Sequence, residues 1–198
     1  MKARAPLLSL ALALSLAACA PSGPNPRYYV LSGPAAPASS AVSGPRLGVL
    51  PVTMPGYLDQ PQLVTRDANG VGIHVDAFSR WGEELSLGVS RLLCESLAAH
   101  GRPAVSLRTG ARTEERLVVE VLRFDGTPGG SATLDALWTL QRRGRILASG
   151  RTVLEEAAGK DTESLIQAQS KLVFRLGSAL AEALPPALPA ETDEDRRR

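Results

Sequence analysis

Alternating hydrophobic and polar residues mark three consecutive strands in the second half of the chain. Residues 132–141 place apolar side chains on one face and polar side chains on the other, and only Leu137 breaks this period of two. Residues 116–124 and 145–154 flank this stretch and are also rich in apolar residues. Because turn-forming residues separate the three stretches, they predict an antiparallel meander.

Two segments show the repeat of three to four residues that is typical of amphipathic helices. The first covers residues 80–99, with Ser79 placed to cap it and glycine and proline soon after its end. The second covers residues 161–184 and ends at a Pro-Pro pair. The residues of the two apolar stripes that we expect in the core include Leu85, Leu92, Leu172 and Leu176.

Shorter extended segments lie before and after the first helix. Residues 46–53, 62–66 and 72–78 carry β-prone residues between breakers, and Pro51 predicts an edge position or a bulge for the first of them. With a short candidate at 104–108, we expect five or six mostly antiparallel strands. The predicted fold class is therefore α+β, a two-layer domain in which a mostly antiparallel sheet carries two amphipathic helices packed on one face.

The start of the chain has the profile of a bacterial signal peptide. A short basic segment precedes an apolar run that is well below the roughly 20 residues needed to span a bilayer. The run stops at Cys19, and the sequence Leu-Ala-Ala-Cys at 16–19 resembles the lipobox of bacterial lipoproteins. This resemblance implies that residues 1–18 are removed and that Cys19 carries acyl chains such as palmitate, which together anchor a protein stably. An incidental cysteine beside an ordinary signal peptide is the alternative.

The remaining chain divides into a tether, one domain and a tail. Residues 19–45 are dominated by Pro, Ser, Ala and Gly, which cannot bury enough apolar surface to become ordered. An apolar Tyr-Tyr-Val-Leu patch interrupts this tether and predicts a short strand at 28–31. Residues 46–186 are expected to form a single domain. Residues 187–198 are charged, lack apolar periodicity and are predicted to be disordered.

Charge and cysteine content narrow the possible partners. The chain has 22 basic and 20 acidic residues, and Lys2 and Arg4 of the signal peptide account for the excess. A balanced mature chain does not favour nucleic acid, whose phosphates select basic surfaces. With Cys19 assigned to lipid, Cys94 is the remaining thiol, so no intramolecular disulfide can form. Its place beside an apolar stripe indicates a small core residue rather than a redox centre.

The sequence contains no recognisable catalytic or cofactor motif. There is no G-x-S-x-G elbow, and the two histidines are His74 in a predicted strand and His100 at a predicted helix end. The histidines and the free cysteine do not match zinc spacings, and Asp59, Asp67 and Asp76 are not spaced as in an EF-hand. Dinucleotide-loop and P-loop spacings are also absent. We therefore predict a protein that is not an enzyme, with no catalytic, cofactor-binding or metal-binding residues.

The segment 55–66 is too apolar for a free loop and too rich in proline for one regular strand. It must be covered, either by its own domain or by a neighbouring copy or partner. Both interpretations stay open from the sequence. The second predicts a subunit or partner contact at or near Tyr57, Leu58 and Arg66.

Several stretches, in one order, resemble the PqiC-type lipoproteins, the family of ABC-type transport auxiliary lipoprotein components. They are YYVL after the lipobox tether, PVTMPGYLDQPQLVTR, RWGEELSLGVSRLLCESLA, VEVLRFDGTPGG and a following LDALWTL. The resemblance runs from Tyr28 to the last predicted helix. The Arg142-Arg143 hairpin and the charged tail do not map onto the family pattern.

The resemblance implies a non-catalytic, periplasm-facing lipoprotein of the outer membrane. Its expected partner is a PqiB-like MCE-domain protein that carries phospholipid between membranes, and the expected assembly is a ring-shaped homo-oligomer docked on the distal end of that tunnel. Ala20 fits onward sorting, because retention in the inner membrane uses aspartate at this position. An outer-membrane assembly lipoprotein that binds a β-barrel or lipopolysaccharide-transport partner is one alternative, and a periplasmic enzyme with an unrecognised site is another.

Overall fold

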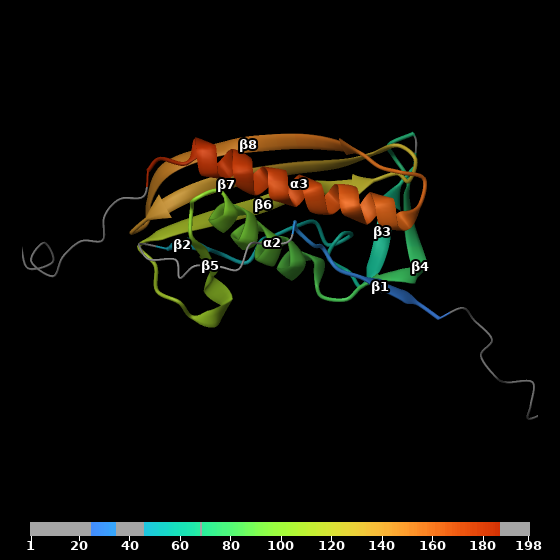
Figure 1. Cartoon of the computed structure of the whole chain (residues 1–198), viewed down its shortest axis with the longest axis horizontal. Helices are drawn as coiled ribbons and strands as arrows, with labels where there is room; N and C mark the ends of the chain where they lie inside the picture. Colours follow the sequence, from blue (N-terminus) through green and yellow to red (C-terminus); the bar gives the residue numbers. More distant parts are fainter. Residues whose placement is uncertain (1–24, 35–45, 68, 187–198) are drawn as a thin grey trace, which may run out of the picture.

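The computed structural model describes residues 25–34, 46–67 and 69–186, which fold into two layers (Figure 1). In these residues, a five-stranded sheet has the order β5-β2-β6-β7-β8, and a three-stranded sheet of order β1-β4-β3 lies at one of its ends. Helices α2 (Leu85–Ala99) and α3 (Thr162–Ala183) pack against each other on one face of the larger sheet. The predicted α+β class, with both helices on one face, is confirmed. The predicted signal peptide, Cys19 and the tail over 187–198 lie outside the described residues.

The three-stranded meander is also confirmed. Strands β6 (Glu115–Gly126), β7 (Ser131–Arg142) and β8 (Arg145–Ala157) pair antiparallel in sequence order. Along β7, every second residue from Ala132 to Leu140 is buried, and Leu137 lies among the outward positions with 39% of its surface exposed. The period of two therefore decides which face of β7 meets the helices.

The remainder of the large sheet is parallel. Strand β2 (Leu47–Val49) lies between β5 (Ala104–Ser106) and β6 and is parallel to both, and a short 3-10 helix, η2 (Leu107–Thr109), follows β5. The edge position considered for residues 46–53 is therefore wrong. Pro51 instead interrupts the pairing of this segment with β6. On either side of it, Leu50 N and Thr53 N donate hydrogen bonds to the Leu117 and Val119 carbonyls of β6.

The prediction of a single sheet needs correction, because three strands form a sheet of their own. Strands β3 (Gln62–Arg66) and β4 (Ile73–Trp81) form an antiparallel hairpin, and β1 (Arg27–Tyr29) pairs parallel to the end of β4. Prolines at 55 and 61 end the pairing with the large sheet and let the hairpin separate from it. The apolar patch predicted as a strand at 28–31 thus contributes its first residues to β1.

Helix α2 begins later than the predicted residue 80. Arg80 and Trp81 still belong to β4, because they pair with Tyr28 and Tyr29 of β1. Ser79 is buried within β4 and does not cap the helix. The carboxylate of Asp59 accepts the Ser86 N–H at 3.2 Å instead, so a residue from a distant turn satisfies the helix start.

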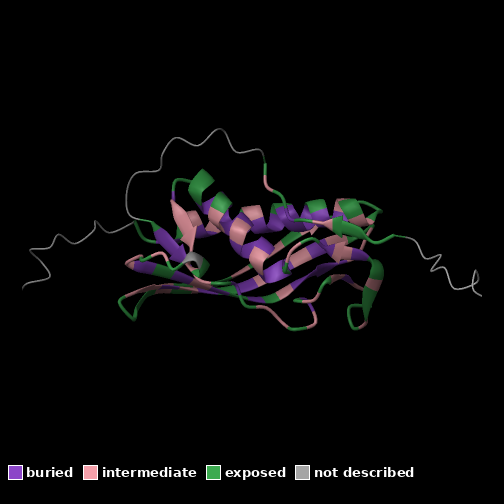
Figure 2. Ribbon diagram, turned by 90° about the horizontal axis from the view of Figure 1, so that it is seen from below, coloured by how far each residue is buried: buried purple, intermediate pink, exposed green. Residues whose placement is uncertain are grey.

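The hydrophobic core fills the space between the two helices and the five-stranded sheet (Figure 2). Leu85, Leu92, Leu172 and Leu176 are each at most 3% exposed, so the predicted inward faces of both helices are confirmed. Asp161 caps α3 by accepting the Ser164 N–H at 2.7 Å. Neither described helix is long and apolar enough to cross a membrane. Because all of these contacts fall within residues 25–186, a chain of residues 20–198 keeps every described part of the fold.

Candidate functional site

The segment predicted as a contact site is held by a buried carboxylate. Asp125, near the end of β6, has no exposed surface. Its carboxylate accepts hydrogen bonds from Tyr57 Oη at 3.1 Å and from Arg66 Nε at 2.9 Å. Arg123 Nε donates a further hydrogen bond at 2.9 Å. The structure therefore brings Tyr57 and Arg66 together through an acidic partner that the sequence analysis did not single out.

Charge balance explains how Asp125 stays ionised in this position. Burial alone would raise the pKa of its carboxyl, but the hydrogen bonds and positive charges of Arg66 and Arg123 outweigh burial and lower that pKa. The hydrogen bond to Asp125 raises the pKa of Arg66. Burial, followed by the Asp125 charge, raises the pKa of Tyr57. The cluster is thus a charged, hydrogen-bonded support, with no group poised to exchange a proton near neutral pH.

Leu58 has a different role from its neighbour Tyr57. Its side chain is 1% exposed and belongs to the hydrophobic core. Leu58 therefore fixes the turn to its own domain, as the first interpretation of this segment expects. The Arg66 side chain keeps 18% of its surface and Tyr57 is half-buried, so these two residues still reach the surface. A contact at or near Tyr57, Leu58 and Arg66 stays a proposal, in which the buried Leu58 holds the turn in place.

An exposed apolar surface adjoins Arg66 on the same hairpin. Val71, Ile73 and Val75, which we call the hairpin patch, are 85%, 43% and 42% exposed. Ile73 is the cross-strand partner of Arg66, and Val75 is the partner of Val64, so these pairs share one face of the hairpin. Exposed apolar side chains grouped in this way are typical of contact surfaces.

A second apolar surface lies on β8, at the edge of the large sheet. Ile146, Leu147 and Val153, which we call the edge patch, are 66%, 40% and 58% exposed. Strand β8 has 13 residues, and among the described residues it pairs with another strand, β7, on one side only. A long edge strand that carries exposed apolar side chains is a surface on which another chain can pair.

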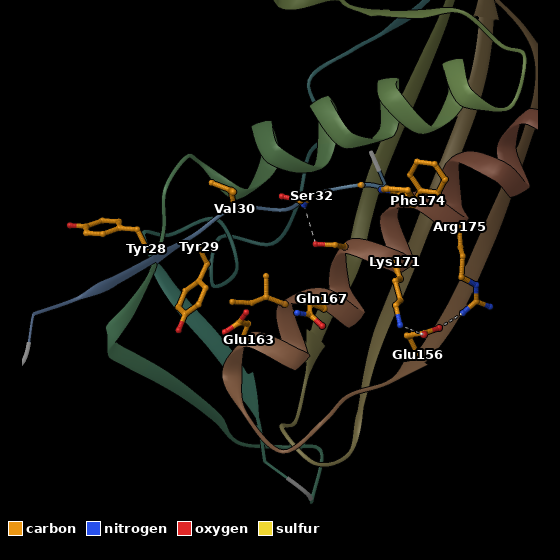
Figure 3. Close-up of a pocket in the computed structure, with 14 residues that line it drawn as sticks. Tyr28, Tyr29, Val30, Ser32, Glu156, Glu163, Gln167, Lys171, Phe174 and Arg175 are labelled. Atoms are coloured by element: carbon orange, nitrogen blue, oxygen red, sulfur yellow. Dashed lines mark hydrogen bonds and ion pairs between the residues drawn. The ribbon is translucent and has the colours of Figure 1, made fainter. Parts of the chain in front are cut away.

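A groove lies between the N-terminal strap, which we define as residues 27–34, and helix α3 (Figure 3). Several contacts fix the strap: β1 pairs with β4, Leu31 is buried in the core, and Ser32 N donates to Ser170 Oγ at 3.2 Å. A side chain at Gly33 would come within 2.9 Å of Leu92, so glycine lets the strap approach the helices closely. The groove has a volume of about 840 Å³.

Helix α3 gives this groove an apolar floor and a polar rim. Ile166, Ser170 and Phe174 follow one another at intervals of four and form the floor. The rim follows the next stripe of the helix, with Glu163, Gln167, Lys171 and Arg175. Figure 3 shows Lys171 and Arg175 reaching toward Glu156 of β8, and their nitrogens lie 3.4 and 3.0 Å from its carboxylate oxygens.

The groove was not predicted from the sequence. The Tyr-Tyr-Val-Leu patch was recognised only as a strand, and Phe174 was not among the residues singled out on the second helix. Two signals were available: an apolar residue outside the main stripe, and polar residues at every fourth position beside it. Neither signal indicates that a segment more than 130 residues away in sequence crosses this helix, as the Ser32–Ser170 hydrogen bond shows.

The two histidines considered for chemistry lie on separate elements. His74 is exposed on β4, and His100 ends α2, where its ring lies 5.4 Å from that of Phe174. In the part of the chain that the structure describes, no group of three His, Cys, Asp or Glu residues is arranged to hold a metal ion. Cys94 is a half-buried free thiol on α2.

The Cys94 thiol is expected to react slowly. Burial, with a smaller contribution from the charge of Glu95, raises its pKa to about 11. Because the thiolate is the nucleophile, alkylation by iodoacetamide at pH 8 should be roughly a hundredfold slower in the folded protein than in urea. Mass spectrometry of residues 20–198 measures both rates. Equal rates in the two conditions would contradict the description of Cys94 as a packing residue.

Comparison with known proteins gives one family match. Residues 29–181 match the family model described as ABC-type transport auxiliary lipoprotein component. No curated protein matches the chain.

Solved structures show the same fold. A crystal structure of an uncharacterised protein aligns with a TM-score of 0.68 at 19% identity, covering 80% of this chain and 98% of the other. A protein of the DUF330 family from Xanthomonas campestris aligns with a TM-score of 0.60 at 19% identity, covering 79% and 90% of the two chains. At these identities the similarity shows the fold alone.

Proposed function

Because the chain belongs to the family of ABC-type transport auxiliary lipoprotein components, we propose that it is the outer-membrane lipoprotein of an MCE-type lipid transport system. In this role it docks the distal end of a PqiB-like MCE-domain protein and catalyses no reaction. The family match over residues 29–181 carries the proposal, since it spans nearly the whole described fold. Signal peptide 1–18 and Cys19 precede the match, and Cys19 supplies the lipid anchor once the signal peptide is removed.

The described surfaces suit a docking protein. Tyr57 and Arg66 are held in place by the buried Asp125, and the apolar hairpin patch lies directly beside them. A rigid polar cluster next to exposed apolar side chains is the usual composition of a protein contact. We therefore place the subunit or partner contact at Tyr57, Arg66 and the hairpin patch, with Leu58 as its buried support.

We further propose that the protein forms a closed homo-oligomeric ring. A head-to-tail contact needs two different surfaces on each subunit, and it closes into a ring when the rotation allows. The hairpin patch and the edge patch supply two such surfaces on different sheets. A ring also matches a cylindrical MCE partner, because each subunit can then make an equivalent contact with the tunnel.

Partner capture tests the function. The full-length lipidated protein, tagged at its C-terminus, is purified from solubilised envelopes, and mass spectrometry identifies what co-purifies with it. We expect an MCE-domain protein as the main partner. Recovery of a β-barrel or lipopolysaccharide-transport protein, without any MCE-domain protein, would replace this proposal with that of an outer-membrane assembly lipoprotein.

Assembly is expected to depend on the hairpin patch. Val71→Asp puts a charge on a side chain that is 85% exposed, so it should leave the fold intact but weaken self-association at least tenfold, or about 1.4 kcal/mol. Light scattering on residues 20–198 measures the assembly, and a thermal melt checks the fold. Val30→Asp, on the strap and 51% exposed, is the matched control and should assemble normally. Normal assembly of Val71→Asp would remove the hairpin patch from the contact.

A further inference from the structure

We propose that the groove between the strap and α3 binds one acyl chain of a phospholipid, with the lipid phosphate held at Lys171 and Arg175. The inference rests on the proposed function for the source of the lipid, since a transport lipoprotein would meet phospholipid at the tunnel exit. The binding itself can be measured without any partner protein. Four features of the groove support this ligand.

The first feature is the apolar lining of the groove. Ile166 and Phe174 form its floor, and Tyr29 and Val30 lie on the strap that bounds it. Val30 keeps 51% of its surface exposed although it borders this cavity. A volume of about 840 Å³ falls within the range of about 300–1,000 Å³ that is typical of small-molecule sites. An apolar ligand would remove the exposed surface of Val30 and of the partly buried Tyr29 and Phe174 from water, which is the main favourable term in such binding.

The second feature distinguishes an acyl chain from a peptide. A bound peptide backbone needs donors and acceptors along its length. Ser170 is the polar residue of the floor, and its hydroxyl already accepts the hydrogen bond of Ser32 N. On the strap, the Leu31 carbonyl accepts from Arg91 Nη2 at 2.8 Å, and the Tyr29 carbonyl accepts from Gly82 N at 2.7 Å. These polar groups of the floor and the strap are therefore already engaged, and the apolar side chains beside them suit a hydrocarbon chain.

The third feature is a cationic end. Lys171 and Arg175 lie one turn apart on α3 and share the single carboxylate of Glu156. Their side chains are 66% and 49% exposed, so both can reach a phosphate at the mouth of the groove. Glu163, the acidic residue of the same rim, lies about 12 Å from Lys171 along the helix axis. The positive charge is thus gathered at one end, as recognition of a phospholipid requires.

The fourth feature is the position of the groove along the chain. Asn25, the first described residue, is six residues after Cys19, a length of chain that reaches about 22 Å at most. If Cys19 carries the lipid anchor, Asn25, just before the strap, is held within this distance of the membrane surface. The strap that bounds the groove is therefore the described part of the chain nearest in sequence to the proposed anchor.

Direct binding tests the proposal. Residues 20–198 are titrated with diheptanoyl phosphatidylglycerol below its micellar concentration, and NMR or calorimetry follows the binding. Inorganic phosphate and heptyl glucoside are titrated separately, because the first lacks an acyl chain and the second lacks a phosphate. We expect saturable binding of the phospholipid at one site, and affinities at least tenfold weaker for each of the other two probes.

Substitutions then locate the site. Gln167→Trp fills the groove from an exposed rim position, and Val30→Asp charges its wall, so each should weaken phospholipid binding at least tenfold. Lys171→Gln should weaken phospholipid binding but leave heptyl glucoside unchanged. Leu137→Asp, on the outward face of β7 and in neither contact patch, is the matched control and should bind as the wild type does. A thermal melt of each variant excludes unfolding.

Three results would overturn the inference: no saturable phospholipid binding, binding that folded Gln167→Trp and Val30→Asp retain, or phosphate binding as tight as that of the lipid. An experiment in cells tests the rival occupant, with a photoreactive amino acid at position 167 of the full-length protein. Phospholipid adducts support the proposal, whereas adducts with a protein in place of lipid would make the groove a protein-docking site. The titration uses only purified protein and lipid. A negative titration therefore counts against the groove, whereas failure to capture an MCE partner counts against the proposed function.

Discussion

Arg66→Met is expected to lower the free energy of unfolding by about 3 kcal/mol. The substitution leaves the Asp125 carboxylate fully buried with one of its two arginines removed. Removing one partner of a buried ion pair costs about 3–5 kcal/mol of stability. We expect the lower end of this range, because Arg123 still pairs with Asp125. Urea denaturation of residues 20–198 at pH 7 measures the change.

Two further variants separate this effect from a general loss of contacts. Arg151→Met breaks another Arg–Asp pair, in which Arg151 is 58% exposed, and it should change stability far less. Adding Asp125→Asn to Arg66→Met should recover part of the loss, because no buried charge then remains without its partner. The explanation fails if the two arginine variants are equally destabilised, or if the double variant is less stable than Arg66→Met.

The same cluster predicts how stability depends on pH. The pKa of Asp125 is lowered in the folded state, so its contribution to stability is present above the ordinary pKa of about 4. That contribution is lost as the pH falls through the lowered, folded-state pKa. Denaturation of the wild type at a series of pH values below 4 should therefore show a steep loss of stability. Asp125→Asn should show a shallower dependence over the same range.

Cys19→Ser is expected to abolish membrane association. The apolar run of the signal peptide stops at Cys19, and among the described residues no helix could span a membrane in its place. Acyl chains on this thiol contribute about 0.8 kcal/mol for each buried methylene, so several chains hold the protein firmly. Fatty-acid labelling and membrane fractionation of the full-length protein measure the effect.

A neighbouring substitution provides the control for sorting. Ala20→Asp keeps the lipid but introduces the residue that retains lipoproteins in the inner membrane, so the labelled protein should move to that fraction. Cys19→Ser should lose the label and leave both membranes. If Cys19→Ser still labels and still fractionates with the outer membrane, the anchor is elsewhere.

Local patterns predicted the parts of the fold that depend on nearby residues. The period of two along residues 132–141 gave both the strand and its buried face, and the helical stripes gave four core leucines. The parallel pairing of β1 with β4 was not predictable in the same way, since it joins residues about 50 positions apart. This pairing also explains the late start of α2, because it keeps Arg80 and Trp81 in a strand.

The candidate site shows the same division between local and distant signals. The apolar residues between prolines indicated a contact near Tyr57 and Arg66. Asp125 lies 59 residues beyond Arg66, and no pattern in its neighbouring residues indicates that it pairs with Arg66. Leu58 could not be told from Tyr57 by sequence, because both are apolar neighbours in one turn. Packing decides between them: Leu58 enters the core, and Tyr57 turns its hydroxyl to Asp125.

The most direct test of the proposed function is binding between two purified proteins. Residues 20–198 are mixed with the soluble periplasmic part of a PqiB-like MCE-domain protein from the same organism, and size-exclusion chromatography with light scattering gives the mass of the complex. We predict a stable complex that contains several copies of this chain, and weaker binding by Val71→Asp than by the matched Val30→Asp control. Separate elution of the two folded proteins at micromolar concentration would contradict the proposal that this lipoprotein docks an MCE tunnel.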